Sequence, residues 1–282
     1  MVVQELTSPS VYLDHWAFRE ISDSKTLSKR FSEALLCRGG TLVLSWLNIV
    51  EFCKVTIDNQ RQNASSFLDK IGPNVFWINP DFFAVAKYES GRSGNCNCPL
   101  PDREIATVHL KVLHSKTQNQ STASLGGGFD VVFNSTNIRQ QFDELGSLIS
   151  SQFEWMRGDQ EINKSLRKPL QPLKLEQPDL HATRLIAREL IGPLVKQRDL
   201  KITHNDAIDL THTVVPVSYC DYVLLDNGWT ARVNQLRARF KKANVYIPMA
   251  KVFSKKNDGM ESFFKELEGY PSAGGAADSS PR

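Results

Sequence analysis

Pro9-Ser10-Val11-Tyr12-Leu13-Asp14-His15 is a short apolar run that ends in a carboxylate. Such a run predicts a buried strand that delivers an acid to the edge of a sheet, which is where open α/β folds bind their ligands. A single aspartate at this place is also typical of a turn or a helix cap. The interpretation therefore depends on whether a later strand ends in the same way.

A second apolar run, Val223-Leu224-Leu225-Asp226, repeats this design near the other end of the chain. Two more strand candidates lie at 41–45 and 74–79, and a last strand is predicted at 244–247. Helical spacing of apolar residues follows or separates these runs at 24–38, 46–56, 81–88, 102–114, 136–157, 180–191 and 229–242. This alternation predicts an α/β fold with a parallel sheet and helices on both faces.

The loop-like composition after residue 88 predicts a division of the chain. Residues 8–90 and 180–250 would form one discontinuous domain, with 91–179 as a mostly helical insertion and 271–282 as a disordered tail. Within the insertion, the prolines of 164–178 predict a linker, and Gly192-Pro193 is expected to interrupt the helix that begins near residue 180.

Composition excludes several classes of protein. The 282 residues are 41% hydrophobic, and 34 basic against 31 acidic groups leave a formal charge of +3, so a nucleic-acid-binding surface would have to be local. The most apolar window, 41–55, contains Asn48 and Glu51 and is too short to span a bilayer, which predicts no membrane segment. Five irregularly spaced cysteines predict a reducing, cytoplasmic protein.

The parallel sheet would bring carboxylates together. Asp14 and Asp226 would emerge at one edge, and Glu51 and Asp206 lie in helices that can reach it. Asp209, three residues after Asp206 on the same helical face, leaves open which of these two is the third ligand. Clustered carboxylates repel one another unless a divalent cation neutralises them, and oxygen ligands suit Mg²⁺ or Mn²⁺. The chemistry of such a site is metal-assisted phosphodiester hydrolysis.

In order and placement, the segments 11–14, 44–51, 205–209 and 223–226 resemble the PIN-domain family of metal-dependent nucleases. The resemblance implies a PIN-like parallel-sheet domain and an endoribonuclease acting on single-stranded RNA, with DNA as a second possible substrate. It leaves open an inhibitor protein as a partner. It also implies that the acidic positions are catalytic and bind the metal, namely Asp14, Glu51, Asp206 and Asp226, with Asp209 as companion or rival to Asp206.

We expect supporting or structural roles for other polar residues near these positions. Ser45 and Asn227 are expected to support the site as polar neighbours. Asp221 opens its strand at the end opposite Asp226, which favours a structural role. The histidines close to the acids in sequence are interpreted as satisfied structural residues, namely His15, His204 and His212.

The predicted helix after Asp226 is basic and carries no acid between Trp229 and Lys242. Beside an acidic metal pocket, such a face is expected to contact the phosphates of a nucleic acid, although basic helix faces are often only solvated. The candidate contacts are Arg232, Arg237, Arg239, Lys241 and Lys242, and a second group extends the surface at Arg184, Arg188, Lys196 and Arg198.

Two alternatives remain open at this stage. A PIN-like scaffold without activity would bind RNA or a protein partner, but it would have no reason to keep a repulsive group of carboxylates. A phosphatase with an aspartyl nucleophile at Asp14 is disfavoured, because His15-Trp16 follows where that chemistry usually has a second aspartate two residues on.

Overall fold

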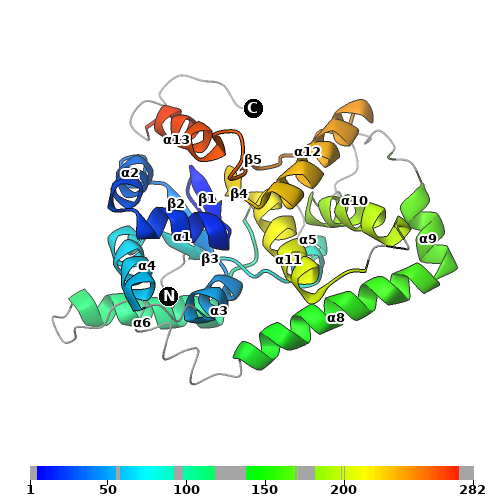
Figure 1. The fold of residues 1–282 in the computed structure, drawn as a ribbon, viewed down its shortest axis with the longest axis horizontal. Coiled ribbons are helices and arrows are strands. Elements are labelled where there is room, and N and C mark those ends of the chain that lie inside the picture. Colours follow the sequence, from blue (N-terminus) through cyan, green and yellow to red (C-terminus); the bar gives the residue numbers. More distant parts are fainter. Residues whose placement is uncertain are drawn as a thin grey trace.

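The fold is that of a computed structural model, which describes residues 5–54, 58–91, 98–117, 138–168, 170, 182–197, 199 and 201–272. At its centre is a five-stranded, fully parallel sheet in the order β3-β2-β1-β4-β5 (Figure 1). The strands are β1 (Ser10–Leu13), β2 (Thr41–Leu44), β3 (Val75–Trp77), β4 (Tyr222–Leu224) and β5 (Lys251–Phe253). The predicted α/β class with a parallel sheet is confirmed.

Helices cover both faces of the sheet, as expected (Figure 1). One face is covered by α1 (His15–Asp23), α2 (Lys25–Leu36), α3 (Trp46–Lys54), α4 (Asp58–Ile71) and α13 (Gly259–Gly269). The other is covered by α5 (Phe82–Ser90), α10 (Ala182–Lys196), α11 (His204–Tyr219) and α12 (Asn227–Lys242). Since strand side chains alternate, Val11 and Leu13 enter the first core and Tyr12 enters the second.

The described part of the range 91–179 holds three helices: α6 (Arg103–Thr117), α8 (Ile138–Gly158) and α9 (Gln160–Arg167). The long helix α8 packs against α11, and its Phe142 contacts the ring of His204. Residues 164–167, which were predicted to begin a linker, are helical in α9, and residues 171–178 lie outside the described part of the chain. Residues 273–282 of the predicted tail also lie outside it.

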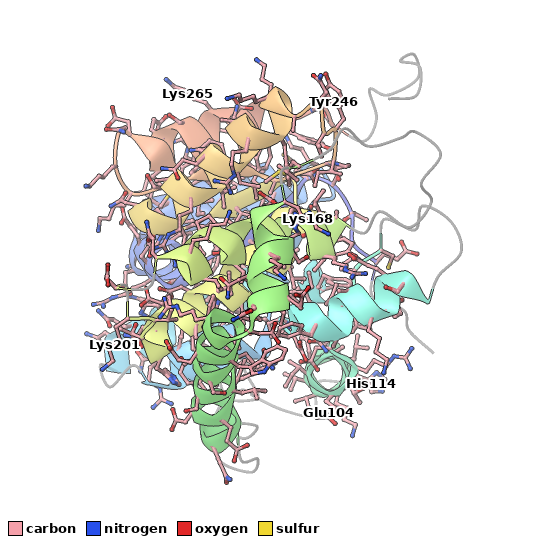
Figure 2. All side chains as sticks on the ribbon, turned by 90° about the vertical axis from the view of Figure 1, so that its right-hand side faces the viewer. Glu104, His114, Lys168, Lys201, Tyr246 and Lys265 are labelled. Carbon is pink, nitrogen blue, oxygen red and sulfur yellow. The ribbon has the colours of Figure 1, made fainter. Side chains whose placement is uncertain are left out.

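The predicted last strand at 244–247 is wrong, because β5 begins only at Lys251. Asn244 has a φ of 53°, a left-handed conformation that ends α12 and that a strand does not allow. Tyr246 is 83% exposed and lies at the outer edge of the molecule (Figure 2), and Pro248 has no N–H for a sheet. The pairing with β4 is made instead by Lys251-Val252-Phe253.

The expected interruption at Gly192-Pro193 is also wrong, since α10 continues to Lys196 with Pro193 inside it. Proline has no N–H for the carbonyl four residues earlier, which belongs to Glu189. The guanidinium of Arg239 donates to that carbonyl at 2.8 Å. Packing of α12 against α10 thus satisfies the group that the proline leaves without its helical partner.

The strand order creates one special position at the carboxyl edge. The chain builds β2 and β3 on one side of β1 and then returns to build β4 and β5 on the other side. The adjacent strands β1 and β4 therefore flank the topological switch point, where open parallel sheets bind ligands. Asp14 and Asp226 follow these two strands.

Candidate metal centre

Asp14 and Asp226 have the same local role at the switch point. The backbone N–H of Asp14 donates to the carbonyl of Leu224 at 3.1 Å, which joins the ends of β1 and β4. Each carboxylate then caps the following helix, because Asp14 accepts from the N–H of His15 at 2.7 Å and Asp226 accepts from that of Trp229 at 2.7 Å. Short strands that run directly into capped helices hold both acids beside one another.

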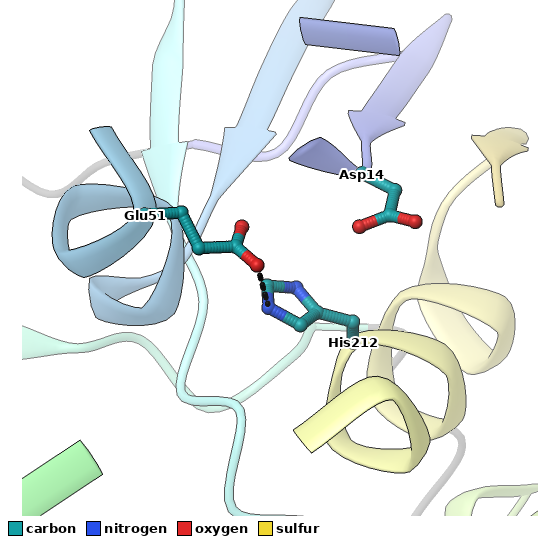
Figure 3. Close-up of side chains that lie close together, drawn as sticks. All are labelled: Asp14, Glu51 and His212. Atoms are coloured by element: carbon teal, nitrogen blue, oxygen red, sulfur yellow. Dashed lines mark ion pairs between the residues drawn. The ribbon is translucent and has the colours of Figure 1, made fainter. Parts of the chain in front are cut away.

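Three side chains from three elements converge beside this edge (Figure 3). Asp14, Glu51 of α3 and His212 of α11 each offer a ligand atom, and these atoms all lie within 4.8 Å of one another. Glu51 Oε1 is 3.6 Å from His212 Nε2, and Glu51 Oε2 is 3.9 Å from Nδ1 of His15. The predicted meeting of Asp14 and Glu51 is therefore seen, and a histidine that the sequence analysis regarded as structural joins them.

His212 is 1% exposed and is held from its other side. Its Nδ1 is hydrogen-bonded to the hydroxyl of Tyr12, whereas its Nε2 has no hydrogen-bond partner among the described residues. Burial lowers the pKa of His212 to about 3, and the nearby His15 lowers it further in the same direction. The ring is consequently neutral near pH 7, so that its contact with Glu51 joins a neutral imidazole to a carboxyl group.

A polar chain runs under the site from β1 to α3. The N–H and hydroxyl of Ser45 lie 2.8 and 3.1 Å from Oδ1 of Asn48, whose Nδ2 donates to the carbonyl of Leu13 at 3.3 Å. Burial raises the pKa of the Tyr12 hydroxyl well above its usual value, and the nearby side chains of Ser45 and Asn48 oppose that rise. Ser45 is thus a polar neighbour of the site, as predicted, whereas Asn227 is exposed at the start of α12.

Asp209 belongs to the electrostatic environment of the edge. Burial raises its pKa to about 7, and the charges of Asp14 and Asp226 add to the rise, while a hydrogen bond from the Trp229 side chain opposes it. Burial likewise raises the pKa of Asp14 to about 6, with a further contribution from Asp226. These shifts indicate carboxylates that are crowded and poorly solvated in the protein alone.

Asp206 has a different environment, although it is one helical turn from Asp209. Its carboxylate accepts from the backbone N–H of Thr203 at 2.9 Å and contacts the Thr203 hydroxyl at 2.6 Å, which completes a capping box at the start of α11. The group formed by Asp14, Glu51 and His212 does not include it. Its role as a metal ligand stays a prediction, and Asp209 is the acid of α11 whose pKa the charges of Asp14 and Asp226 raise.

The basic residues of α12 fall into two sets. Arg237 donates to the carbonyl of Ala250, and Arg239 lies 3.6 Å from the Glu189 carboxylate in addition to its bond to the Glu189 carbonyl. Arg232 stacks over the ring of Trp229 at 4.6 Å. Lys241 and Lys242 are exposed in the last turn, about 22 Å along the helix from Asp226. The predicted phosphate contacts remain predictions for all five.

A small cavity of about 20 Å³, with room for about one water molecule, lies between α1, α3 and α4 beside Glu51. Its walls include the apolar side chains of Phe18 and Phe52 and the two cations Arg19 and Arg61. Arg19 also contacts Asp23 at 3.6 Å. No sequence signal marks this group, because Arg61 lies in α4, a helix for which no element was predicted.

Comparisons with known proteins identify no relative: no protein-family model matches the chain, and no curated protein or solved structure is similar to it. Across the described residues, no helix combines the length and the hydropathy that a membrane crossing needs.

Proposed function

We propose that this protein is a metal-dependent nuclease of the PIN-like type, an endoribonuclease that hydrolyses single-stranded RNA. The observation that carries the proposal is the convergence of Asp14, Glu51 and His212 at the topological switch point of a parallel sheet. Asp209 and Asp226 add further negative charge there. A divalent cation would relieve the crowding that raises the pKa values of Asp14 and Asp209.

The donor set fits such a cation. Asp14 and Glu51 supply carboxylate oxygens from fixed elements, and Asp226 and Asp209 lie close enough to act on the charge of Asp14. Mg²⁺ and Mn²⁺ are bound through few carboxylates together with water and substrate phosphates. When bound, the cation would lower the pKa of a water molecule and stabilise negative charge on phosphoryl oxygens.

The chain's own residues would hold the substrate. Arg19 and Arg61 lie beside Glu51, where their guanidinium groups would contact phosphate oxygens of a strand bound at the metal. Lys241 and Lys242 are exposed farther away on α12, where they would contact phosphates of a longer strand. The described cysteines Cys37, Cys98 and Cys220 are free thiols, which agrees with a cytoplasmic location.

The test is cleavage of a closed circular single-stranded RNA, which only an endonuclease can open. The full chain is incubated with this RNA, or with the matching DNA circle, in Mn²⁺, Mg²⁺ or EDTA. Asp14→Asn and Asp226→Asn are compared with Glu33→Gln, a change on the exposed face of α2. We expect metal-dependent cleavage that EDTA and both aspartate variants abolish and that Glu33→Gln leaves intact.

Cleavage that resists EDTA, or that persists unchanged in both aspartate variants, would contradict the proposal. Cleavage of the DNA circle alone would correct the substrate. Binding of RNA without cleavage in any metal would instead support the inactive scaffold.

A further inference from the structure

We propose that His212 supplies a nitrogen ligand to the metal, that Tyr12 positions it, and that the site therefore prefers Mn²⁺ to Mg²⁺. The inference rests on the metal binding in the proposed function and adds the choice of metal to it. A site made of carboxylates alone would need neither His212 nor Tyr12.

The imidazole of His212 lies in an environment that suits a metal ligand. His212 is 1% exposed, and its Nε2 has no hydrogen-bond partner among the described residues. Nε2 lies 3.6 Å from Glu51 Oε1, and a ligand atom of His212 lies within 4.8 Å of one from Asp14. A buried nitrogen without a partner is destabilising, because it has lost its hydrogen bonds to water. Coordination of a cation by the same atom would satisfy it. Figure 3 shows the ring of His212 pointing towards Glu51.

Hydrogen bonds around the ring favour the tautomer that leaves Nε2 without a proton. Oδ1 of Asn48 can only accept, and it already faces the N–H of Ser45. The Ser45 hydroxyl therefore donates to Oδ1, which leaves its oxygen as the acceptor that the nearby Tyr12 hydroxyl would use. In the tautomer that we propose, the Tyr12 oxygen accepts from Nδ1–H of His212, the atom to which it is hydrogen-bonded.

The start of this chain is fixed, because Nδ2 of Asn48 donates to the Leu13 carbonyl and so turns Oδ1 towards Ser45. With its proton on Nδ1, neutral His212 carries a lone pair on Nε2, the atom that faces Glu51. A histidine ligand usually donates its other ring N–H to a fixed acceptor, which orients the ring. The Tyr12 hydroxyl is that acceptor here, and it comes from the same strand that delivers Asp14.

The ligand atoms of the site also favour one metal over the other. Asp14 and Glu51 offer oxygen, which both Mg²⁺ and Mn²⁺ accept. Imidazole nitrogen favours first-row transition metals, whereas Mg²⁺ retains oxygen ligands and water. One nitrogen among carboxylates therefore moves the preference from Mg²⁺ towards Mn²⁺.

The experiment measures Mn²⁺ and Mg²⁺ binding to the full chain by calorimetry, without substrate. Pulsed electron paramagnetic resonance of the Mn²⁺-loaded protein detects nitrogen bound to the metal. The variants are His212→Asn, Tyr12→Phe and Asp14→Asn. Tyr222→Phe is the matched control, since Tyr222 lies on the adjacent strand and its hydroxyl donates to the Glu266 carbonyl instead.

We expect wild-type protein to bind Mn²⁺ at least tenfold more tightly than Mg²⁺, with a nitrogen signal. His212→Asn should remove the signal and most of the preference, and Tyr12→Phe should lower Mn²⁺ affinity about tenfold, the lower limit for residues that orient a ligand. Tyr222→Phe should change neither. Thermal unfolding of each variant checks that it is folded.

A folded His212→Asn that keeps both the nitrogen signal and the Mn²⁺ preference would overturn the inference. Wild-type protein that binds Mn²⁺ through Asp14 without a nitrogen signal would also overturn it, and would leave the proposed function standing. Unchanged Mn²⁺ binding by Asp14→Asn would show that the metal does not bind at this site, and would contradict both proposals. If His212→Asn does not fold, the test is the nitrogen signal of the wild-type protein together with the Mn²⁺ affinity of Tyr12→Phe.

Discussion

The strands β1 and β4 are joined by polar groups at both of their ends, and the two ends differ in how well those groups are satisfied. At the amino end, the Asp221 carboxylate accepts from the backbone N–H of Ser10 at 2.7 Å and from its hydroxyl at 2.9 Å. The N–H of Asp221 lies 2.9 Å from Oγ of Ser10 in return. This closed pair matches the structural role that the sequence predicted for Asp221.

At the carboxyl end, the polar side chains are poorly satisfied by hydrogen bonds. Asp14 and Asp209 have raised pKa values, and Nε2 of His212 is buried without a hydrogen bond among the described residues. A partly buried acid whose hydrogen bonds are satisfied, such as Asp221, is therefore not in itself a sign of function. A functional site is indicated instead by a group of acids that repel one another and have no neutralising partner in the protein itself.

The largest expected effect is that of Glu51→Gln at the carboxyl end. The amide keeps the shape of the side chain and removes the charge, so we expect kcat/KM for RNA cleavage to fall about a thousandfold, or about 4 kcal/mol. The measurement is initial rates in saturating Mn²⁺, with Glu33→Gln as the control. A reduction of less than about tenfold would mean that Glu51 is not part of the centre.

At the amino end, Asp221→Ala should reduce stability and leave the metal site unaffected. It leaves the N–H and hydroxyl of buried Ser10 without their acceptor, so we expect a loss of about 3 kcal/mol in the free energy of unfolding. Mn²⁺ affinity of the folded protein should not change. Urea titration and calorimetry measure the two quantities, and weakened metal binding with normal stability would show that the two ends are not independent.

Asp209→Asn tests the repulsion at the carboxyl end through pH. The pKa of Asp209 is about 7 when folded and about 3.9 when unfolded, so the folded state binds more protons between these values and becomes less stable as pH rises towards 7. In Asp209→Asn the side chain does not titrate, so this fall in stability with rising pH is absent. In EDTA, its stability relative to wild type should increase by about 1 kcal/mol between pH 5.5 and 8, after allowance for partial exposure.

Comparing the two proteins at each pH cancels the titration of His212, whose lowered pKa changes stability in the opposite direction below pH 6.5. Saturating Mn²⁺ should reduce the difference, since the cation replaces the proton. A stability difference that does not vary with pH would contradict the crowding of Asp209.

The smallest expected effect is that of Asp206→Ala. Loss of the capping box should lower the free energy of unfolding by about 1 kcal/mol and leave metal binding unchanged. Thr203→Ala should cost a similar amount, and the double variant should cost less than the sum because the two side chains form one unit. If Asp206→Ala abolishes Mn²⁺ binding, Asp206 is the third ligand after all.

Local pattern alone determined the class of fold. Apolar runs bounded by turn residues marked four of the five strands, and helical spacing marked most of the helices between them although not α1 and α4, because both periods follow from backbone geometry. The order of these elements required a parallel sheet, and a parallel sheet placed Asp14 and Asp226 at one edge. The last strand was misplaced because a short apolar run does not reveal whether a sheet edge lies beside it.

Tertiary structure alone decided which polar side chains meet. Tyr12 and His212 are 200 residues apart in sequence, and no periodicity relates them. Asp206 and Asp209 have equivalent positions in a helical pattern, yet the packing of α11 turns one to a cap and the other towards Asp14. Helix α10 continues through Pro193 because Arg239 of a different helix satisfies the freed carbonyl. The sequence thus supplies the acids, and the crossing of distant elements determines their neighbours and their chemistry.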